Sequence, residues 1–408
     1  NALKFSCSKK PRAKNKSPII VQPSIMFSPR ACLRMLPRRG FSSMGVPDYH
    51  AAALKGSSVQ DKVVTVFGAT ALLGTPVVES LFSAGAAAVV LPYRAGGDGD
   101  KRMQRLVDLQ PRVDMGCGNR VVPVAIDFRD KSHLKQVCSK SQIVVNLIGR
   151  DWNETKDGGF IDWSMYDLQT HLAEEIARAA SEAGAEKHLY CSGLAANENC
   201  ITDWGKSKWL GEKACTAANP KTTNFRTSAF LGEGDREFCY YAMEAAKYGA
   251  IWMPVNGESK KQHLYIYDVA AAMVKSLEHP GELVKVAGRR TTKNELASFA
   301  FELIGKTPNV LDMSELVAKR IASAQDLNQT AGSEGTDMML LRYYVDIILP
   351  EAEGQGQYLD FGLTTTPWDI AHTFPTIKRL RAAVEAADGK AVPNAEELYV
   401  PATVGFKK

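Results

Sequence analysis

The chain has 408 residues, 45% hydrophobic and 23% charged, which suits one large or two unequal folded domains. Its formal net charge is +5, but residues 1–47 hold ten Lys or Arg and no acid, so residues 48–408 carry 40 basic and 45 acidic side chains. This mildly acidic body disfavours nucleic-acid binding. No apolar run approaches the roughly 18 residues that span a bilayer, so we expect any membrane association to be peripheral.

The basic leader, residues 1–47, is rich in Arg and Ser, with Leu, Phe and Met scattered through it from Met26 onward. This composition is typical of an organellar transit peptide, and we expect processing between Arg39 and Ser43. A disordered basic tail with another purpose is the alternative. Because the chain begins with Asn1 rather than Met, residues 1–25 could lie outside the mature protein.

The eight cysteines form no CxxC pair, and the seven histidines form no HxH or HExxH arrangement. We therefore expect reduced thiols in a reducing compartment and no metal site. Each histidine is interpreted as a surface or packing residue.

The first predicted strand, 63–67, runs into a glycine turn, 68–74, and then into a helix that begins at Thr75. Strand, glycine turn and helix in this order are typical of a dinucleotide-binding βαβ unit. The first glycine permits the tight turn, the last lets the helix pack close to the strand, and free helix amides face a pyrophosphate. An α/β turn that merely needs glycine is the alternative. The residues predicted to bind the cofactor here are Gly68, Thr70, Ala71 (at the middle glycine position), Leu72, Leu73 and Gly74.

The second predicted strand, residues 86–94, ends in Arg94. An NAD site usually has Asp or Glu there, about 20 residues beyond the glycines, to bind the ribose 2′-hydroxyl. Arg94, with Lys101 and Arg102 beyond it, suits a 2′-phosphate instead, which predicts NADPH as the cofactor. A solvated surface arginine is the alternative.

Strands and helices then alternate, which predicts an α/β fold with a Rossmann-type doubly wound parallel sheet. Helices are expected at residues 132–138, 168–184 and 204–218, and strands at 121–127, 142–149, 187–192 and 223–232. Ligands of such sheets bind at the carboxyl ends of the strands. The cofactor-binding residues predicted at these ends are Asp127, for an adenine amino group, then Leu147, Ile148 and Gly149, then Ser192 and Ser228. A polar loop, residues 150–159, follows the fourth strand.

The domain organisation predicted after the leader has three parts. Residues 48–232 form the NADP-binding Rossmann domain, with a polar lead-in at 48–60. Residues 233–386 form a smaller C-terminal α+β region interleaved with that domain, and 387–408 form a polar tail that wraps over a surface or a partner. An amphipathic helix is expected at 295–304, and the apolar run 340–349 is interpreted as core packing.

These motifs resemble the extended short-chain dehydrogenase/reductase superfamily, in its atypical branch. Four runs are more specific and are similar to the nucleotide-binding accessory subunits of mitochondrial respiratory complex I: residues 65–70, 92–94, 145–152 and 230–238. The likeness covers roughly residues 60–370. It implies other complex I subunits as partners and a peripheral place on the matrix side of the mitochondrial inner membrane.

The chain departs from active members of the superfamily at the Tyr-x-x-x-Lys helix, where it has Trp204 and Lys208. An indole N–H only donates a hydrogen bond and cannot exchange a proton as a phenol does. Lys208 could still bind the nicotinamide ribose. The resemblance therefore implies structural NADPH binding without turnover, in support of assembly or stability of the matrix arm.

Three alternatives remain open. The helix could be misaligned and another tyrosine, Tyr190 or Tyr240, could act, although neither has Lys four residues on. The protein could be an active NADP-dependent reductase or epimerase of mitochondria or plastids. It could also be a free NADPH-sensing regulator.

Overall fold

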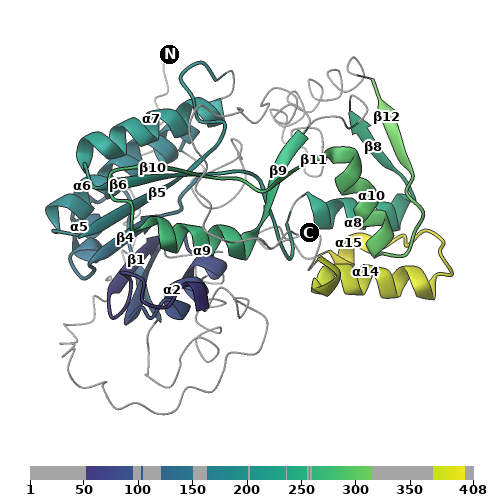
Figure 1. The fold of residues 1–408 in the computed structure, drawn as a ribbon, viewed down its shortest axis with the longest axis horizontal. Helices are drawn as coiled ribbons and strands as arrows, with labels where there is room; N and C mark the ends of the chain where they lie inside the picture. The colour runs from purple at the N-terminus through teal and green to yellow at the C-terminus, as the bar shows by residue number, and fades with distance from the viewer. Residues whose placement is uncertain are drawn as a thin grey trace, which may run out of the picture. The chain divides into compact units, whose positions relative to one another are not determined.

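The computed structural model describes residues 52–94, 103, 121–149, 163–200, 203–235, 237–254, 257, 260–314 and 371–399 (Figure 1). The basic leader, Lys101, Arg102, the polar loop 150–159 and the apolar run 340–349 lie outside the described residues. No helix within the described ranges is long and apolar enough to cross a membrane.

Seven parallel strands form the central sheet, in the order β10-β6-β5-β4-β1-β2-β3. Their bounds are β1 (Val63–Phe67), β2 (Ala88–Tyr93), β3 (Val121–Ala125), β4 (Ile143–Asn146), β5 (Lys187–Gly193), β6 (Thr222–Thr227) and β10 (Leu283–Val286). The order runs outward from β1 in one direction and from β4 in the other, which confirms the predicted doubly wound sheet. The switch point between β1 and β4 is where such a sheet places its ligand.

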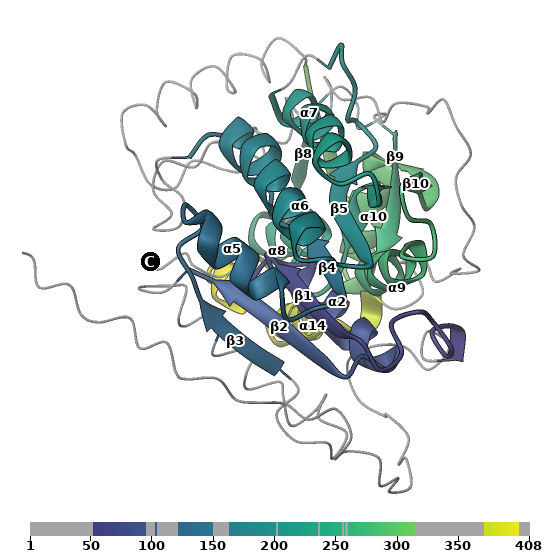
Figure 2. The same cartoon turned by 90° about the vertical axis from the view of Figure 1, so that its left-hand side faces the viewer.

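Helices cover both faces of this sheet (Figures 1 and 2). One face carries α5 (Lys131–Cys138), α6 (Leu172–Glu182) and α7 (Asp203–Ala218), and the other carries α2 (Gly74–Ser83) and α9 (Ile266–Ser276). Neighbouring helices pack on each other, α5 on α6, α6 on α7 and α2 on α9. Because both faces are covered, the strands can be apolar on both sides, which explains their continuous Val- and Ile-rich runs.

Strand β1 illustrates how the sequence produces this layering. Val64 and Val66 belong to the core between the sheet and α2, whereas Phe67 belongs to the core on the α5–α6 face. Thr65 also lies between these layers, and its hydroxyl contacts the Ser141 hydroxyl at 2.6 Å and donates to the carbonyl of Val137 at 3.2 Å. The one polar side chain of the strand is therefore satisfied inside the protein.

Two predicted segments differ in the structure. The helix expected from residue 168 begins as a π-helical turn, η1 (Asp167–His171), before α6, and it ends as expected at Gly184, which has φ +75°. The lead-in 48–60 is not simply polar, because Leu54 and Val59 are fully buried in the main core. They contribute apolar area to the core. Their burial could not be predicted from the sequence, because their neighbours in the chain are mostly charged or polar.

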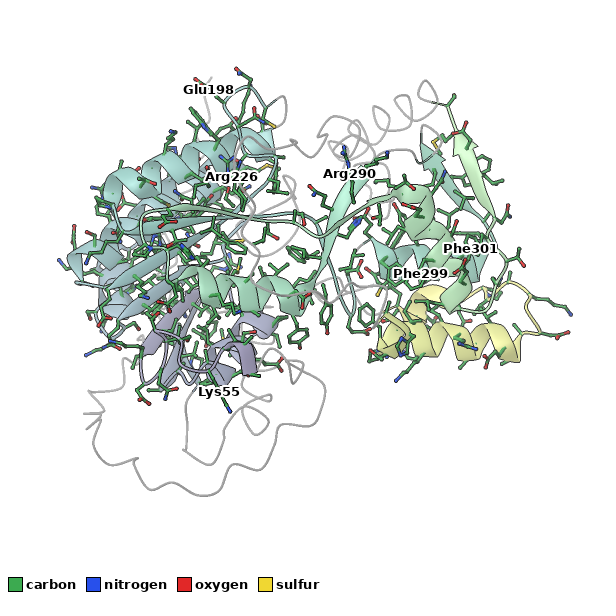
Figure 3. All side chains as sticks on the ribbon, viewed as in Figure 1. Lys55, Glu198, Arg226, Arg290, Phe299 and Phe301 are labelled. Carbon is green, nitrogen blue, oxygen red and sulfur yellow. The ribbon has the colours of Figure 1, made fainter. Side chains whose placement is uncertain are left out.

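The chain from residue 230 onward builds smaller sheets and helices. These elements are β7 (Phe230–Leu231), α8 (Phe238–Tyr248), β8 (Ile251–Pro254), β9 (Lys260–Tyr265), β11 (Arg289–Thr292), α10 (Lys293–Leu303) and β12 (Val310–Met313). Phe299 of α10 stacks on Phe238 of α8 with ring centroids 5.6 Å apart (Figure 3). Strand β10 lies within this stretch but pairs with β6 of the central sheet, so the chain passes between the central sheet and the smaller sheets. The predicted domain bounds stay a prediction.

Residues 371–399, here called the C-terminal cover, contain η3 (Ala371–Thr373), α14 (Pro375–Ala386) and α15 (Ala395–Leu398). Both α14 and α15 pack on α8, and the amide of Val392 donates to the carbonyl of Ala246 at 2.9 Å. The described part of the predicted polar tail, residues 387–399, therefore lies on a surface of its own chain.

Candidate dinucleotide site

The turn between β1 and α2 needs glycine at both ends, for two different reasons. Gly68 has φ +81°, and a Cβ placed on it would lie 2.9 Å from the amide nitrogen of Ile148. Gly74 has an ordinary backbone, but a Cβ there would lie 1.9 Å from the carbonyl oxygen of Ala69. The first glycine thus permits the turn and brings β1 close to the end of β4, and the second lets α2 start directly on the turn.

The start of α2 is uncharged and lacks a side-chain cap. Its N-cap residue, Leu73, makes no side-chain cap hydrogen bond, and its first turn contains no acid. Ala71, in the middle of the turn, is exposed, while Thr70 and Leu72 are half-buried. Uncapped helix amides next to an exposed turn are a suitable place for an anionic group.

The end of β4 faces this turn. The amide of Leu147 donates to the carbonyl of Phe67 at 2.9 Å, and the amide of Ile148 donates to Oδ1 of Asn146 at 2.9 Å. Gly149 follows in an exposed position, and a Cβ on it would lie 3.0 Å from Nζ of Lys208. The segments 68–74 and 147–149, here called the strand-end corner, are therefore adjacent, and Lys208 reaches the corner from α7.

Lys208 is held in place although its side chain is almost buried. Its Nζ donates to the carbonyl oxygen of Cys191 at 2.8 Å and lies 5.1 Å from the centre of the Tyr190 ring. Only 5% of Lys208 is exposed, so these contacts offset part of the cost of burying its charge. The ammonium group is fixed beside Gly149, where it can donate a hydrogen bond to a group placed at the strand-end corner.

The two tyrosines that could replace the missing phenol are both engaged elsewhere. Tyr190 is fully buried and donates its hydroxyl to the carbonyl of Gln169 at 2.7 Å, and burial raises its pKa well above 10. Tyr240 packs edge-on against Tyr399 of the C-terminal cover, with ring centroids 6.0 Å apart. Burial and the hydrogen bond to Gln169 disfavour Tyr190 as the acid.

Two predicted serines lie at the ends of neighbouring strands. Ser192, near the end of β5, is 3% exposed, and its hydroxyl has no hydrogen-bond partner in the part of the chain that the structure describes. Ser228 follows β6 and is 5% exposed, and its hydroxyl makes a long contact, 3.4 Å, with the carbonyl oxygen of Ala229. A buried hydroxyl without a partner is costly unless a ligand supplies one.

Arg94 and Asp127 follow strands β2 and β3, which lie on the side of β1 opposite to β4. Arg94 directly follows β2 and is half-buried, and Asp127 is exposed two residues beyond β3. One carboxylate oxygen of Asp127 accepts the amide of Arg129 at 2.9 Å within its own turn. Since β1, β2 and β3 are parallel neighbours, both residues occupy the same carboxyl edge as the glycine turn. Within the described residues, no group of three or more His, Cys, Asp and Glu could hold a metal ion.

Trp204 lies at the second position of α7, where active relatives are expected to have tyrosine. Its indole packs on the backbone of Gly193, because a Cβ added to Gly193 would lie 2.3 Å from Cη2 of the indole. Gly193 was not among the residues predicted to bind the cofactor. The Ser-Gly pair at the end of β5 was the only local signal for it. No sequence pattern predicted the π-helical turn that places Gln169 next to Tyr190.

The strand order and the strand-end corner define a Rossmann-type protein with its candidate site at the switch point. Residues 64–287, more than half of the chain, match the model of the NAD dependent epimerase/dehydratase family, and the chain belongs to this family.

Curated relatives support the resemblance predicted from the sequence. The chain is similar to NADH dehydrogenase (ubiquinone) 1 alpha subcomplex subunit 9, mitochondrial, of Arabidopsis thaliana, with 32% identity over 66% of this chain and 65% of that protein. The mouse (Mus musculus) protein of the same name is 30% identical over 56% of each chain. This chain thus spans less than two thirds of the length of these relatives. It is also 26% identical to the ceramide reductase of Caulobacter vibrioides, over 62% of this chain and 74% of that one.

Solved structures agree on the fold. The structure of Pen from Bacillus thuringiensis matches with a TM-score of 0.53 at 12% identity, over 63% of this chain and 78% of that one. The dTDP-glucose 4,6-dehydratase of Bacillus anthracis, solved in complex with NAD, matches with a TM-score of 0.51 at 14% identity, over 62% and 84%. Identities this low show a shared fold and nothing more.

Proposed function

We propose that this chain is a non-catalytic accessory subunit of mitochondrial NADH:ubiquinone oxidoreductase, complex I, and that it binds NADPH as a fixed ligand. One observation carries the proposal: the glycines of the corner pack closely on backbone, and the helix with Lys208 has Trp204 where the resemblance implies a proton-transferring tyrosine. A cofactor-binding site that lacks a general acid suits binding of the cofactor without turnover. The names of the mitochondrial relatives supply the complex.

The residues present fit a dinucleotide. The turn from Gly68 to Gly74 and the uncapped start of α2 would hold the pyrophosphate, and the backbone at 147–149 would lie along it. Lys208 would bind the nicotinamide ribose, and Ser192 and Ser228 would line the nicotinamide end. Bound NADPH can supply a hydride, but in this proposal the chain lacks a group that would use it.

The preference for NADPH rests on Arg94. A guanidinium group just beyond β2 suits the planar, charged 2′-phosphate, and an acid at this place would repel it. Asp127, at the end of the next strand, would accept from the adenine amino group.

The proposed place of the chain is peripheral, on the matrix side of the inner membrane among other complex I subunits. There the nucleotide would support assembly or stability of the matrix arm. A ligand that binds only the folded chain stabilises it by mass action, so NADPH can matter without being consumed.

Native-gel separation of solubilised mitochondrial membranes, followed by mass spectrometry, tests the complex. We expect this chain in the complex I band. Recovery of the chain only as a free protein would contradict the proposal.

Denaturing the purified protein and identifying the released nucleotide tests the ligand. We expect NADPH, in a ratio near one per chain. Arg94→Glu should lose it, whereas the control Lys55→Glu, which reverses an exposed charge away from the strand ends, should keep it. Release of mainly NAD(H) would show that the role of Arg94 is misassigned.

A second candidate function is an active NADP-dependent reductase or epimerase. The similarity to a ceramide reductase is the observation that favours it. The two functions differ in turnover: a reductase consumes NADPH when a carbonyl substrate is added, and a structural subunit does not. Sustained NADPH consumption with a ceramide-type ketone would favour the enzyme.

A further inference from the structure

The position of Trp204 in the fold is fixed by its neighbours on both sides. Asp203, the first residue of α7, accepts the hydroxyl of Tyr166 at 3.1 Å. Gly205 packs so closely on the preceding loop that a Cβ there would lie 2.2 Å from Sγ of Cys200 and 2.9 Å from the carbonyl of Ala195. The start of α7 therefore cannot shift freely, and the indole between these two anchors has a defined direction.

That direction leads onto the end of β5. The indole covers Gly193, with its Cη2, Cζ2 and Cζ3 atoms 2.3 to 3.2 Å from the place of a Cβ. No side chain fits at residue 193 while the indole is there. The backbone of Gly193 is not in the left-handed region, so glycine is needed here for space and not for its conformation.

The surroundings place this contact at the nicotinamide end of the proposed site. The residue before Gly193 is Ser192, whose buried hydroxyl lacks a partner within the described residues. One turn along α7 from Trp204, Lys208 donates to the carbonyl of Cys191, on the other side of Ser192. The indole thus stands over the strand end where a substrate would have to approach the cofactor.

We propose that Trp204 and Gly193 form a matched pair in which the indole fills the substrate position and shields the nicotinamide of bound NADPH. The inference rests on the proposed binding of NADPH and adds to it a physical reason for inertness. In this proposal the indole of Trp204 closes the substrate position, and the site also lacks a general acid. Exclusion of other molecules from a reduced cofactor prevents side reactions.

The pairing predicts a particular pattern of mutant effects. Gly193→Ala should push the indole aside, whereas Trp204→Ala should remove it, so each opens the nicotinamide end. Once the indole is gone, an alanine at residue 193 has room. The double variant should therefore resemble Trp204→Ala rather than show the sum of two losses.

Hydride transfer from bound NADPH to N-methylphenazinium, a small soluble acceptor, measures the shielding. The acceptor takes the hydride and NADPH becomes NADP⁺. We expect wild-type protein with its bound NADPH to react slowly, and Trp204→Ala and Gly193→Ala to react about tenfold faster. The control Trp209→Ala, which removes another indole of the same helix, should leave the rate unchanged.

Thermal unfolding of four proteins, the wild type, Trp204→Ala, Gly193→Ala and the double variant, tests the contact without any ligand. Gly193→Ala should lower the melting temperature by about 3 °C or more in the Trp204 background and by much less in the Trp204→Ala background. Equal losses in both backgrounds would overturn the matched pair. An unchanged oxidation rate in Trp204→Ala, with NADPH still bound, would overturn the shielding. Absence of any bound nucleotide in the wild type would instead refute the proposed function, and the melting data would still decide the contact.

Discussion

At the strand-end corner, backbone packs on backbone: Gly68 lies against Ile148, and Gly74 lies against Ala69. At the C-terminal cover, side chains reach across from one segment to another. Glu233 accepts from the amide of Thr376 at 3.1 Å and from its hydroxyl at 2.8 Å, and Tyr399 donates to the carbonyl of Asp235 at 3.1 Å. Close backbone packing leaves no slack, whereas a side-chain hydrogen bond can open locally.

This difference suggests different roles. In the proposed function, a corner with only one arrangement keeps the backbone amides that would bind the pyrophosphate in place. When one of these hydrogen bonds is lost, the cover keeps the apolar contacts of Phe374, Ile377 and Leu380 with the main core, so it should open only locally while the sheet stays folded. Mutations should therefore affect nucleotide binding and global stability at the corner, and only local opening at the cover.

The largest effect is expected from Gly74→Ala. Its Cβ would overlap the carbonyl of Ala69, a backbone atom that cannot move without displacing the turn. We expect a loss of about 3 kcal/mol in the free energy of unfolding, measured by urea titration, together with loss of bound NADPH.

The matched control is Gly305→Ala. Gly305 has φ +78° but no atom within 4 Å of the added Cβ, so only backbone strain of about 1 kcal/mol is expected. If Gly74→Ala cost no more than this control, close packing at the corner would not be the reason for its glycine.

The sheet should also be sensitive to acid, because His188 is buried in β5. Burial lowers the pKa of His188 to about 3, and its Nδ1 contacts the hydroxyl of Thr222 at 2.9 Å. The unfolded chain takes up this proton near pH 6.5 and the folded chain does not, so stability is complete above pH 6.5 and falls as the pH drops from there toward 3.

Between pH 7 and pH 5 this one group should cost about 2 kcal/mol of unfolding free energy, measured by urea titration at both values. His188→Gln keeps a polar partner for Thr222. Between pH 7 and pH 5 it should lose about 2 kcal/mol less unfolding free energy than the wild type. The exposed His372→Gln serves as the control and should lose as much as the wild type. An identical acid loss in His188→Gln would assign the effect to other groups.

The same contrast explains how far the sequence could be interpreted. The corner could be predicted, because an apolar strand, two glycines and a helix follow one another within a few residues and each has a local physical meaning. Gly184 ended its helix as expected for the same reason. The parallel order of the strands followed from their alternation with helices.

What could not be predicted depends on residues far apart in the chain. Glu233 and Thr376 are 143 positions apart, and nothing near either residue indicates the other. The contact of Trp204 with Gly193 depends on the path of the chain between β5 and α7, and hydrophobic periodicity does not predict that path. The burial of Leu54 and Val59 depends on which surface the short lead-in meets.

At the cover, Glu233→Ala should have a moderate and local effect. The carboxylate caps the start of α14 from another segment, and loss of such a cap costs about 1 kcal/mol. Hydrogen exchange in residues 375–386 should speed up, while bound NADPH and the exchange of β1 and β4 stay unchanged. Glu385→Ala, which removes an exposed pair with Arg381 on the same helix, should change exchange by less. Both variants should retain their bound NADPH. Release of NADPH by Glu233→Ala would mean that the cover and the corner are coupled.

The smallest effect should come from Tyr399→Phe. The ring, which packs edge-on against Tyr240, is retained, and the hydrogen bond to the carbonyl of Asp235 is lost. The expected cost is about 0.5 kcal/mol, because water can replace the donor at this partly exposed end of α15. Exchange in residues 390–399 should increase slightly, and Tyr399→Leu, which also loses the aromatic contact, should increase it more. If the two variants opened the end of the cover equally, the hydrogen bond rather than the ring would hold this end, and the difference from the backbone packing at the corner would be sharper still.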